Sequence, residues 1–237
     1  MKTILHRFET RGHADHGWLN SYHSFSFANY HNAERMHFGA LRVLNDDTVA
    51  GGRGFGTHPH SNMEIVSIPL EGELQHMDDM GNSTVIKTGD IQVMSAGKGV
   101  SHSEYNKNQN KPVKFLQIWI IPNKKNVLPR YDQISIKDIA ISNSLTQILS
   151  PNPDDAGVWI YQHAWFYIGD YDAGKTDSYT FKKEDNGVYI FVLEGEIEIE
   201  GQKLLKRDGL GIWEVDSFTM KATSNSKILV MEVPMNQ

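Results

Sequence analysis

Short β-rich segments recur along this chain at roughly ten-residue spacing, and glycine, asparagine or aspartate separates them. The segments are either continuously apolar or alternate between apolar and polar residues, which is typical of buried and half-buried strands. Many short strands with turn residues between them predict an all-β sandwich or barrel. The clearest such segments are Glu64–Leu70, Ile91–Met94, Phe115–Ile121, Tyr189–Ile197 and Gly209–Trp213.

The strand pattern repeats once. The tetrapeptide Leu-Glu-Gly-Glu occurs at Leu70–Glu73 and again at Leu193–Glu196, 123 residues later. An apolar strand-like segment precedes each copy, and a segment rich in glycine and apolar residues follows each at a similar distance. The shared surroundings of the tetrapeptide favour a duplicated fold over a chance match. Between the halves, residues 123–130 are polar and contain proline. We therefore predict two domains, residues 1–134 and residues 135–237.

Composition excludes several classes of protein. The 237 residues carry a net charge of -6 and no long run of lysine or arginine, which argues against direct binding of nucleic acid or of an anionic membrane surface. The chain has no cysteine, so disulfides, thiolate metal sites and cysteine nucleophiles are excluded. The first residues lack the apolar core of a signal peptide, and no apolar run is long enough to span a bilayer. We expect a soluble, cytoplasmic protein.

Two histidine-containing pairs have the spacing of metal ligands on strands. His58 and His60 flank a proline, and His102 and Glu104 have the same separation farther along the chain. Residues i and i+2 of a strand project from the same face, so each pair can aim both side chains at one point. One His-x-His among 11 histidines is weak evidence, but the second pair makes a metal site the better interpretation. Three imidazoles and a carboxylate suit iron, manganese, cobalt, nickel, copper or zinc, and their spacing does not distinguish among these metals.

The segments around these pairs resemble the two cupin motifs in the form that the pirin family carries them, and the N-terminal segments resemble the start of bacterial pirin-like quercetin dioxygenases. The resemblance extends over nearly the whole chain and is strongest in residues 10–132. It rests on Gly17–Leu19, His23–Phe27, Gly56–His60, Leu70–Gly72, Met80–Asn82 and Gly89–Glu104.

The resemblance implies a bicupin, in which two antiparallel β-barrels pack against each other and only the N-terminal barrel binds metal. It also implies that His58, His60, His102 and Glu104 are the ligands of one divalent transition metal ion, usually iron. Glu64 occupies a position where many other cupins have a glutamate ligand but pirins do not. We therefore expect Glu64 to orient a ligand imidazole instead of binding the metal.

The sequence itself gives a reason for a single metal site. The last histidine is His163, so the second Leu-Glu-Gly unit contains none. Positions 123 residues beyond His58 and His60 are Phe181 and Lys183. The C-terminal half therefore cannot reproduce the three imidazoles, and we expect it to be a scaffold.

The activity that the resemblance implies is 2,3-dioxygenation of a flavonol such as quercetin, which uses O2, opens the central ring and releases carbon monoxide. Glu104, a carboxylate beside the metal, is the candidate general base. One alternative is a redox-sensing metal-binding pirin that acts in regulation through a protein partner. Others are a cupin enzyme with a different phenolic or enediol substrate, and a structural cupin whose metal is incidental.

A flat polyphenol also needs an apolar slot. The candidate walls are Phe55, Met94, Trp119 and the aromatic residues of Trp18–Phe27, although core packing explains each of them as well. Arg53 and Lys98 are candidates for the mouth of the slot. We expect His23 and His76 to be structural or surface histidines.

Overall fold

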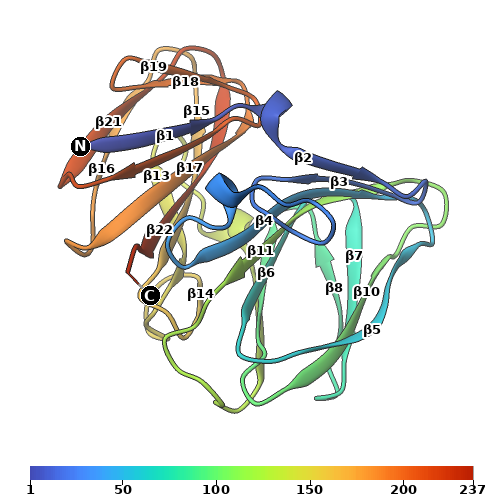
Figure 1. Cartoon of the computed structure of the whole chain (residues 1–237). Helices are drawn as coiled ribbons and strands as arrows, with labels where there is room; N and C mark the ends of the chain where they lie inside the picture. Colours follow the sequence, from blue (N-terminus) through green and yellow to red (C-terminus); the bar gives the residue numbers. More distant parts are fainter. Residues whose placement is uncertain (237) are drawn as a thin grey trace.

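The computed structural model describes residues 1–236, which form an almost entirely β-structure (Figure 1). Three single-turn 3-10 helices interrupt the strands: η1 (Phe8–Thr10), η2 (Ala33–Arg35) and η3 (Ile136–Asp138). The predicted all-β class is confirmed. No helix in the described part of the chain has the length and apolar character needed to cross a membrane.

The N-terminal half contains a seven-stranded and a four-stranded sheet. The larger sheet has the order β12-β9-β6-β11-β4-β3-β2 and the smaller one the order β5-β10-β7-β8, and neighbouring strands in both are antiparallel. The strands are β2 (Gly12–Asp15), β3 (Leu19–His23), β4 (Leu41–Val49), β5 (Gly54–His60), β6 (Glu64–Glu71), β7 (Glu73–Asp78), β8 (Ser83–Lys87), β9 (Asp90–Ser95), β10 (Val100–Asn106), β11 (Val113–Ile120) and β12 (Arg130–Ser135).

The C-terminal half repeats this arrangement with sheets of the same sizes. Their orders are β1-β20-β17-β22-β15-β13-β14 and β16-β21-β18-β19. The strands are β1 (Lys2–His6), β13 (Leu145–Ser150), β14 (Val158–Trp159), β15 (Trp165–Tyr171), β16 (Thr176–Thr180), β17 (Asn186–Glu194), β18 (Glu196–Ile199), β19 (Gln202–Leu205), β20 (Gly209–Trp213), β21 (Ser217–Ala222) and β22 (Ser226–Pro234).

The two Leu-Glu-Gly copies occupy equivalent turns. Gly72 joins β6 to β7 and Gly195 joins β17 to β18, with φ angles of 84° and 77° that favour glycine. The strand order β9-β6-β11-β4 of the first half matches β20-β17-β22-β15 of the second. The duplication inferred from the tetrapeptide is therefore present in the topology. Closure of each pair of sheets into a barrel stays a prediction.

One apolar core joins the halves. Val66 and Ile118 from the first half belong to the same buried cluster as Phe191 and Met231 from the second. The first strand also crosses between the halves, because β1 pairs with β20 and lies among the C-terminal strands (Figure 1). The boundary drawn between residues 134 and 135 lies at the end of β12 and stays a prediction.

Candidate metal centre

The two histidine pairs lie on neighbouring strands of the smaller N-terminal sheet. In the antiparallel pairing of β5 with β10, His58 lies opposite His102, and the register shifts before Glu104, which lies opposite Phe55. This shift is a β-bulge that adds one residue to β5 between Phe55 and His58. A bulge re-aims the side chains around it. Here it lets Phe55 and His58 line the same cavity although they are three residues apart.

The three imidazoles converge. The ring centroids of His58 and His102 are 4.5 Å apart, those of His58 and His60 are 4.8 Å apart, and those of His60 and His102 are 5.0 Å apart. One ring nitrogen from each histidine lies within 4.8 Å of the other two. The edge-to-face ring of Trp119 lies 5.0 Å from the ring of His60. The structure therefore brings together the three histidines that the sequence singled out.

The hydrogen bonding of these rings suits a cation. Nδ1 of His58 lies 2.7 Å from the carbonyl oxygen of Gly56, in the bulge, so Nδ1 carries the proton and Nε2 is left with its lone pair. Nε2 of His60 and both ring nitrogens of His102 are buried and have no hydrogen-bond partner within residues 1–236. Burial lowers the pKa of His60 to about 4 and that of His102 to about 3. Neutral imidazoles with unpaired lone pairs are the form that binds a transition metal.

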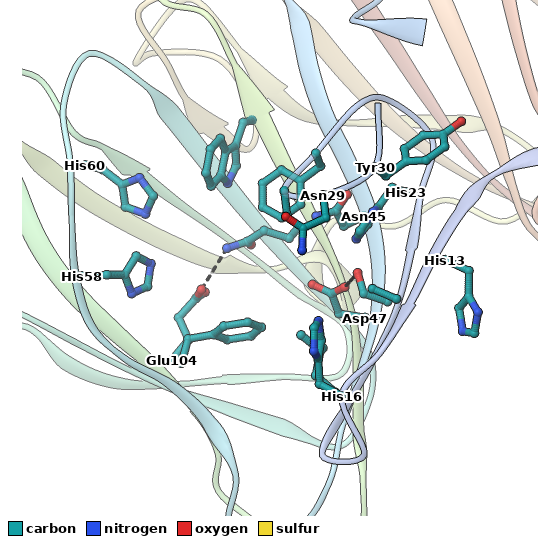
Figure 2. Close-up of a pocket in the computed structure, with 18 residues that line it drawn as sticks. His13, His16, His23, Asn29, Tyr30, Asn45, Asp47, His58, His60 and Glu104 are labelled. Atoms are coloured by element: carbon teal, nitrogen blue, oxygen red, sulfur yellow. Dashed lines mark hydrogen bonds between the residues drawn. The ribbon is translucent and has the colours of Figure 1, made fainter. Parts of the chain in front are cut away.

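Glu104 is buried and held by two neighbouring side chains. The Nε2 amide of Gln117 donates to Oε2 of Glu104 at 2.8 Å, a bond that ends on the labelled Glu104 in Figure 2. The hydroxyl of Ser67 lies 3.0 Å from Oε1. Burial raises the pKa of Glu104 to about 7. The carboxylate forms a second cluster of potential ligand atoms with His76 and His102. Glu104 therefore adjoins the imidazole cluster through His102.

His76 was expected to be structural, and its contacts fit that role. Its Nε2 lies 2.9 Å from Oδ2 of Asp78, and both side chains are fully buried. Asp78 also accepts hydrogen bonds from the backbone N–H groups of Met80 and Asn82 and from the Asn82 amide. Burial raises the pKa of Asp78, but the hydrogen bonds from His76 and Asn82 outweigh burial and lower it overall. His76 is thus tied to the turn between β7 and β8, with its ring 5.4 Å from that of His102.

The expectation that Glu64 orients a ligand imidazole is wrong. Glu64 and Ser67 are three residues apart on β6, so they face opposite sides of the sheet. Ser67 contacts Glu104, whereas Glu64 accepts a hydrogen bond from the hydroxyl of Ser95 at 2.6 Å. Val66, on the same face as Glu64, belongs to the core between the halves. Burial raises the pKa of Glu64 to about 7.

A cavity of about 560 Å³ opens beside the imidazoles (Figure 2). Phe55, Trp119 and Phe27 line it, as the sequence suggested. The rings of Phe27 and Trp119 meet edge to face at 5.4 Å. The surface of the cavity is mainly apolar, which is typical of sites for small organic ligands.

Other sequence expectations about this cavity are wrong. Met94 lies outside its walls and packs in a buried cluster with Ile65 and Val100. Arg53 and Lys98 are exposed and do not line it either. The expectation for His23, a structural or surface histidine, is not contradicted, because His23 is buried; it also lines the cavity.

Sequence reasoning missed the polar residues that support the site. Ser67 and Gln117 hold Glu104, and Asn45 and Asp47 line the same cavity. Ser67 and Gln117 each interrupt an apolar strand, and Asn45 and Asp47 belong to a polar stretch of β4 although both are buried. A polar residue in a buried strand was the signal that could have marked them.

The interior of the C-terminal half is filled by apolar side chains. The strands equivalent to β5 and β10 are β16 and β21, whose buried residues include Tyr179, Phe218 and Met220. The rings of Tyr179 and Phe218 lie 5.8 Å apart, and the neighbouring ring of Phe181 lies 6.2 Å from that of Phe218. Packed aromatic rings take the place of the imidazole cluster in this half.

A duplicated all-β fold with clustered histidines inside one of its halves is that of a bicupin. Comparison with known protein families shows which bicupin family the chain resembles. The family model named Pirin matches residues 5–120, and the model described as the quercetinase C-terminal cupin domain matches residues 147–233. The chain belongs to the pirin family.

Similar proteins support this assignment over nearly the full length. A quercetin 2,3-dioxygenase of Escherichia coli K12 is 40% identical over 234 residues, which cover 97% of this chain and 98% of the relative. The crystal structure of the bacterial pirin YhhW from Escherichia coli in complex with nickel(II) is 39% identical, with a TM-score of 0.93 and coverage of 98% and 99%. A pirin-like protein of Caulobacter vibrioides is 36% identical and covers 95% of this chain and 97% of its own length.

Proposed function

We propose that the protein is a metal-dependent dioxygenase that opens the central ring of a flavonol such as quercetin with O2 and releases carbon monoxide. The observation that carries this proposal is the convergence of His58, His60 and His102, which bring one ring nitrogen each to within 4.8 Å of the others. His58 and His60 also line one end of a mainly apolar cavity. The names of the relatives support the reaction, because two curated relatives are named quercetin 2,3-dioxygenase. One related structure is a complex with nickel(II).

In this proposal His58, His60, His102 and Glu104 hold one divalent transition metal ion, with iron as the first candidate. A bound ion acts as a Lewis acid and lowers the pKa of a phenolic hydroxyl beside it. Glu104 takes up the proton that this hydroxyl loses. Gln117 and Ser67 keep the carboxylate in place during that transfer.

The apolar walls of the cavity bind the substrate and take no part in metal binding. Trp119, Phe27 and Phe55 hold a flat polyphenol and exclude water from the reacting ring. The C-terminal half covers one side of the N-terminal half and contributes no metal ligand.

The test is to load the purified protein with iron, manganese, cobalt, nickel, copper or zinc and to follow quercetin absorbance together with O2 consumption. We expect one ion per chain, and ring opening that disappears with His58→Ala. His163→Ala is the matched control, because this exposed histidine belongs to the C-terminal half and should leave both readouts unchanged. Bound metal without turnover of any flavonol would overturn the dioxygenase and favour a sensor that acts through a protein partner, or a cupin enzyme for another phenol.

A further inference from the structure

The cavity has a second polar end, away from the imidazoles. Asn45 and Asp47 on β4 and His23 on β3 line it, whereas His58 and His60 lie on the other side (Figure 2). These polar residues are all at least 96% buried on the β3–β4 side. Nothing in the proposed metal chemistry uses them.

The second polar end is part of a row that crosses four strands. In the register of the larger sheet, Ser67 of β6 lies opposite Gln117 of β11, Gln117 lies opposite Asn45 of β4, and Asn45 lies opposite His23 of β3. Directly opposed residues of an antiparallel sheet project from the same face, with Cβ atoms about 5 Å apart. The row therefore runs along the cavity floor from Ser67 and Gln117, which contact Glu104, to His23.

The two ends of this row differ in hydrogen bonding. Gln117 is satisfied, because it donates to Glu104 and its Oε1 lies 2.7 Å from the hydroxyl of Ser67. Oδ1 of Asn45 and Nδ1 of His23 are buried and have no partner among the described residues. A buried polar atom without a partner costs about 1–3 kcal/mol. The distal end of the row therefore has acceptor capacity that the protein itself leaves unused.

Asp47 adds a carboxyl group to this end. The hydroxyl of Ser21, which lies opposite Asp47 on β3, donates to Oδ1 of Asp47. Asp47 and Asn45 are two residues apart on β4, so both side chains face the cavity. Burial raises the pKa of Asp47 to about 7. Near neutral pH its free oxygen can therefore accept a hydrogen bond or donate one.

We propose that Asn45, Asp47 and His23 form a hydroxyl-binding subsite that takes the dihydroxyphenyl ring of a polyphenol. Two neighbouring oxygen acceptors on one strand match two hydroxyl donors on one ring. An anionic substituent is disfavoured, because it would face the carboxyl of Asp47. Phe27 and Trp119 bound the apolar space between this subsite and the imidazoles, where the central rings of the ligand fit. This inference rests on the proposed flavonol chemistry and adds which end of the bound molecule lies away from the imidazoles.

The test measures binding without turnover. Dissociation constants for quercetin and for galangin, the flavonol whose pendant ring carries no hydroxyl, are measured anaerobically on the metal-loaded protein. We expect the wild type to bind quercetin about 10-fold or more tightly than galangin, since a site built for a hydroxyl discriminates strongly against a ligand that lacks it. Asn45→Leu should weaken quercetin binding and bring the ratio close to one, with the affinity for galangin nearly unchanged.

Two further variants test the individual oxygen atoms of the subsite. Asn45→Asp retains Oδ1 and should restore most of the preference for quercetin over galangin. Asp47→Asn tests separately whether the carboxyl group of Asp47 contributes to this preference. Asn20→Leu is the control, because Asn20 precedes Ser21 on β3 and faces the opposite side of the sheet. If Asn45→Leu and Asp47→Asn both prefer quercetin over galangin as strongly as the wild type does, the subsite is overturned.

The outcomes also separate the subsite from the proposed reaction. A wild-type ratio near one with normal ring opening would overturn only the subsite. A high ratio that Asn45→Leu abolishes, with no ring opening by the wild type, would support the subsite and overturn only the dioxygenase. A metal-loaded protein that binds neither flavonol would overturn both.

Discussion

The amide of Gln117 donates to the carboxylate of Glu104 at 2.8 Å, from a strand of the other sheet. This bond joins the larger sheet, which contributes no histidine to the imidazole cluster, to the strand that carries His102 and Glu104. A residue that hydrogen-bonds a metal ligand orients that ligand and contributes to metal affinity.

Gln117→Met preserves the length of the side chain but removes the donor. Glu104 then loses the bond to Oε2, and we expect metal affinity to fall about 10–100-fold with the fold retained. Competition with a chromogenic chelator measures the affinity, and circular dichroism checks the fold. Gln147→Met is the control, because Gln147 bonds to the carbonyl oxygen of Ala156 in the C-terminal half. Unchanged metal affinity in Gln117→Met would show that Glu104 needs no such support.

Trp119 should report on metal binding. Its ring lies 5.0 Å from that of His60, so an open-shell ion such as copper(II) or nickel(II) at the imidazoles quenches its fluorescence. We expect a saturable loss of emission on titration, most of which Trp119→Phe removes. Trp213→Phe, in the C-terminal half, should keep the loss. Equal quenching in both variants would place the ion elsewhere.

Glu64→Gln should change stability and leave metal binding alone. Burial raises the pKa of Glu64 from 4.5 to about 7, so the folded protein binds this proton more tightly than the unfolded chain. The contribution of Glu64 to stability is then fully present below about pH 4.5 and is lost as the pH rises to about 7. The loss amounts to about 3 kcal/mol, at 1.36 kcal/mol for each pKa unit.

We therefore expect Glu64→Gln to gain stability relative to the wild type between pH 5 and pH 8, as measured by urea unfolding of the metal-free protein at several pH values. Glu71→Gln, at an exposed pair with Lys114, is the control and should show little of this trend. Weaker metal binding by Glu64→Gln would contradict this prediction. It would mean that Glu64 does orient a ligand imidazole, although it lies on the opposite face of β6.

Asp78→Ala should destabilise the N-terminal half. Asp78 is the buried acceptor for His76 and for the turn residues Met80 and Asn82, and its removal leaves these donors without a partner. We expect a loss of roughly 3 kcal/mol or more in the free energy of unfolding. Thermal and urea unfolding measure it. Asp154→Ala, in an exposed loop, should change stability by less than about 0.5 kcal/mol. Similar stability of the two variants would mean that water replaces the lost acceptor.

Much of the fold could be predicted from local pattern. The segments Glu64–Leu70 and Ile91–Met94 lie in β6 and β9, and Phe115–Ile121 overlaps β11 up to Ile120, because their apolar and β-branched residues suit buried strands. The repeated Leu-Glu-Gly marked the equivalent turns β6–β7 and β17–β18, since each turn has its glycine at positive φ. The pairing of β1 with the C-terminal sheet left no such local sign, because strand pairing across more than 200 residues depends on the whole topology.

The sequence by itself determined the three-histidine cluster. The i, i+2 spacing of His58 and His60 puts both side chains on one face of any strand, and only one further His-x-Glu pair was available to join them. Tertiary structure decided what surrounds that cluster. It put Glu64 on the far face of β6, Gln117 beside Glu104, and Asn45 at the other end of the cavity, since a side chain's neighbours across a sheet are set by strand register and not by distance along the chain.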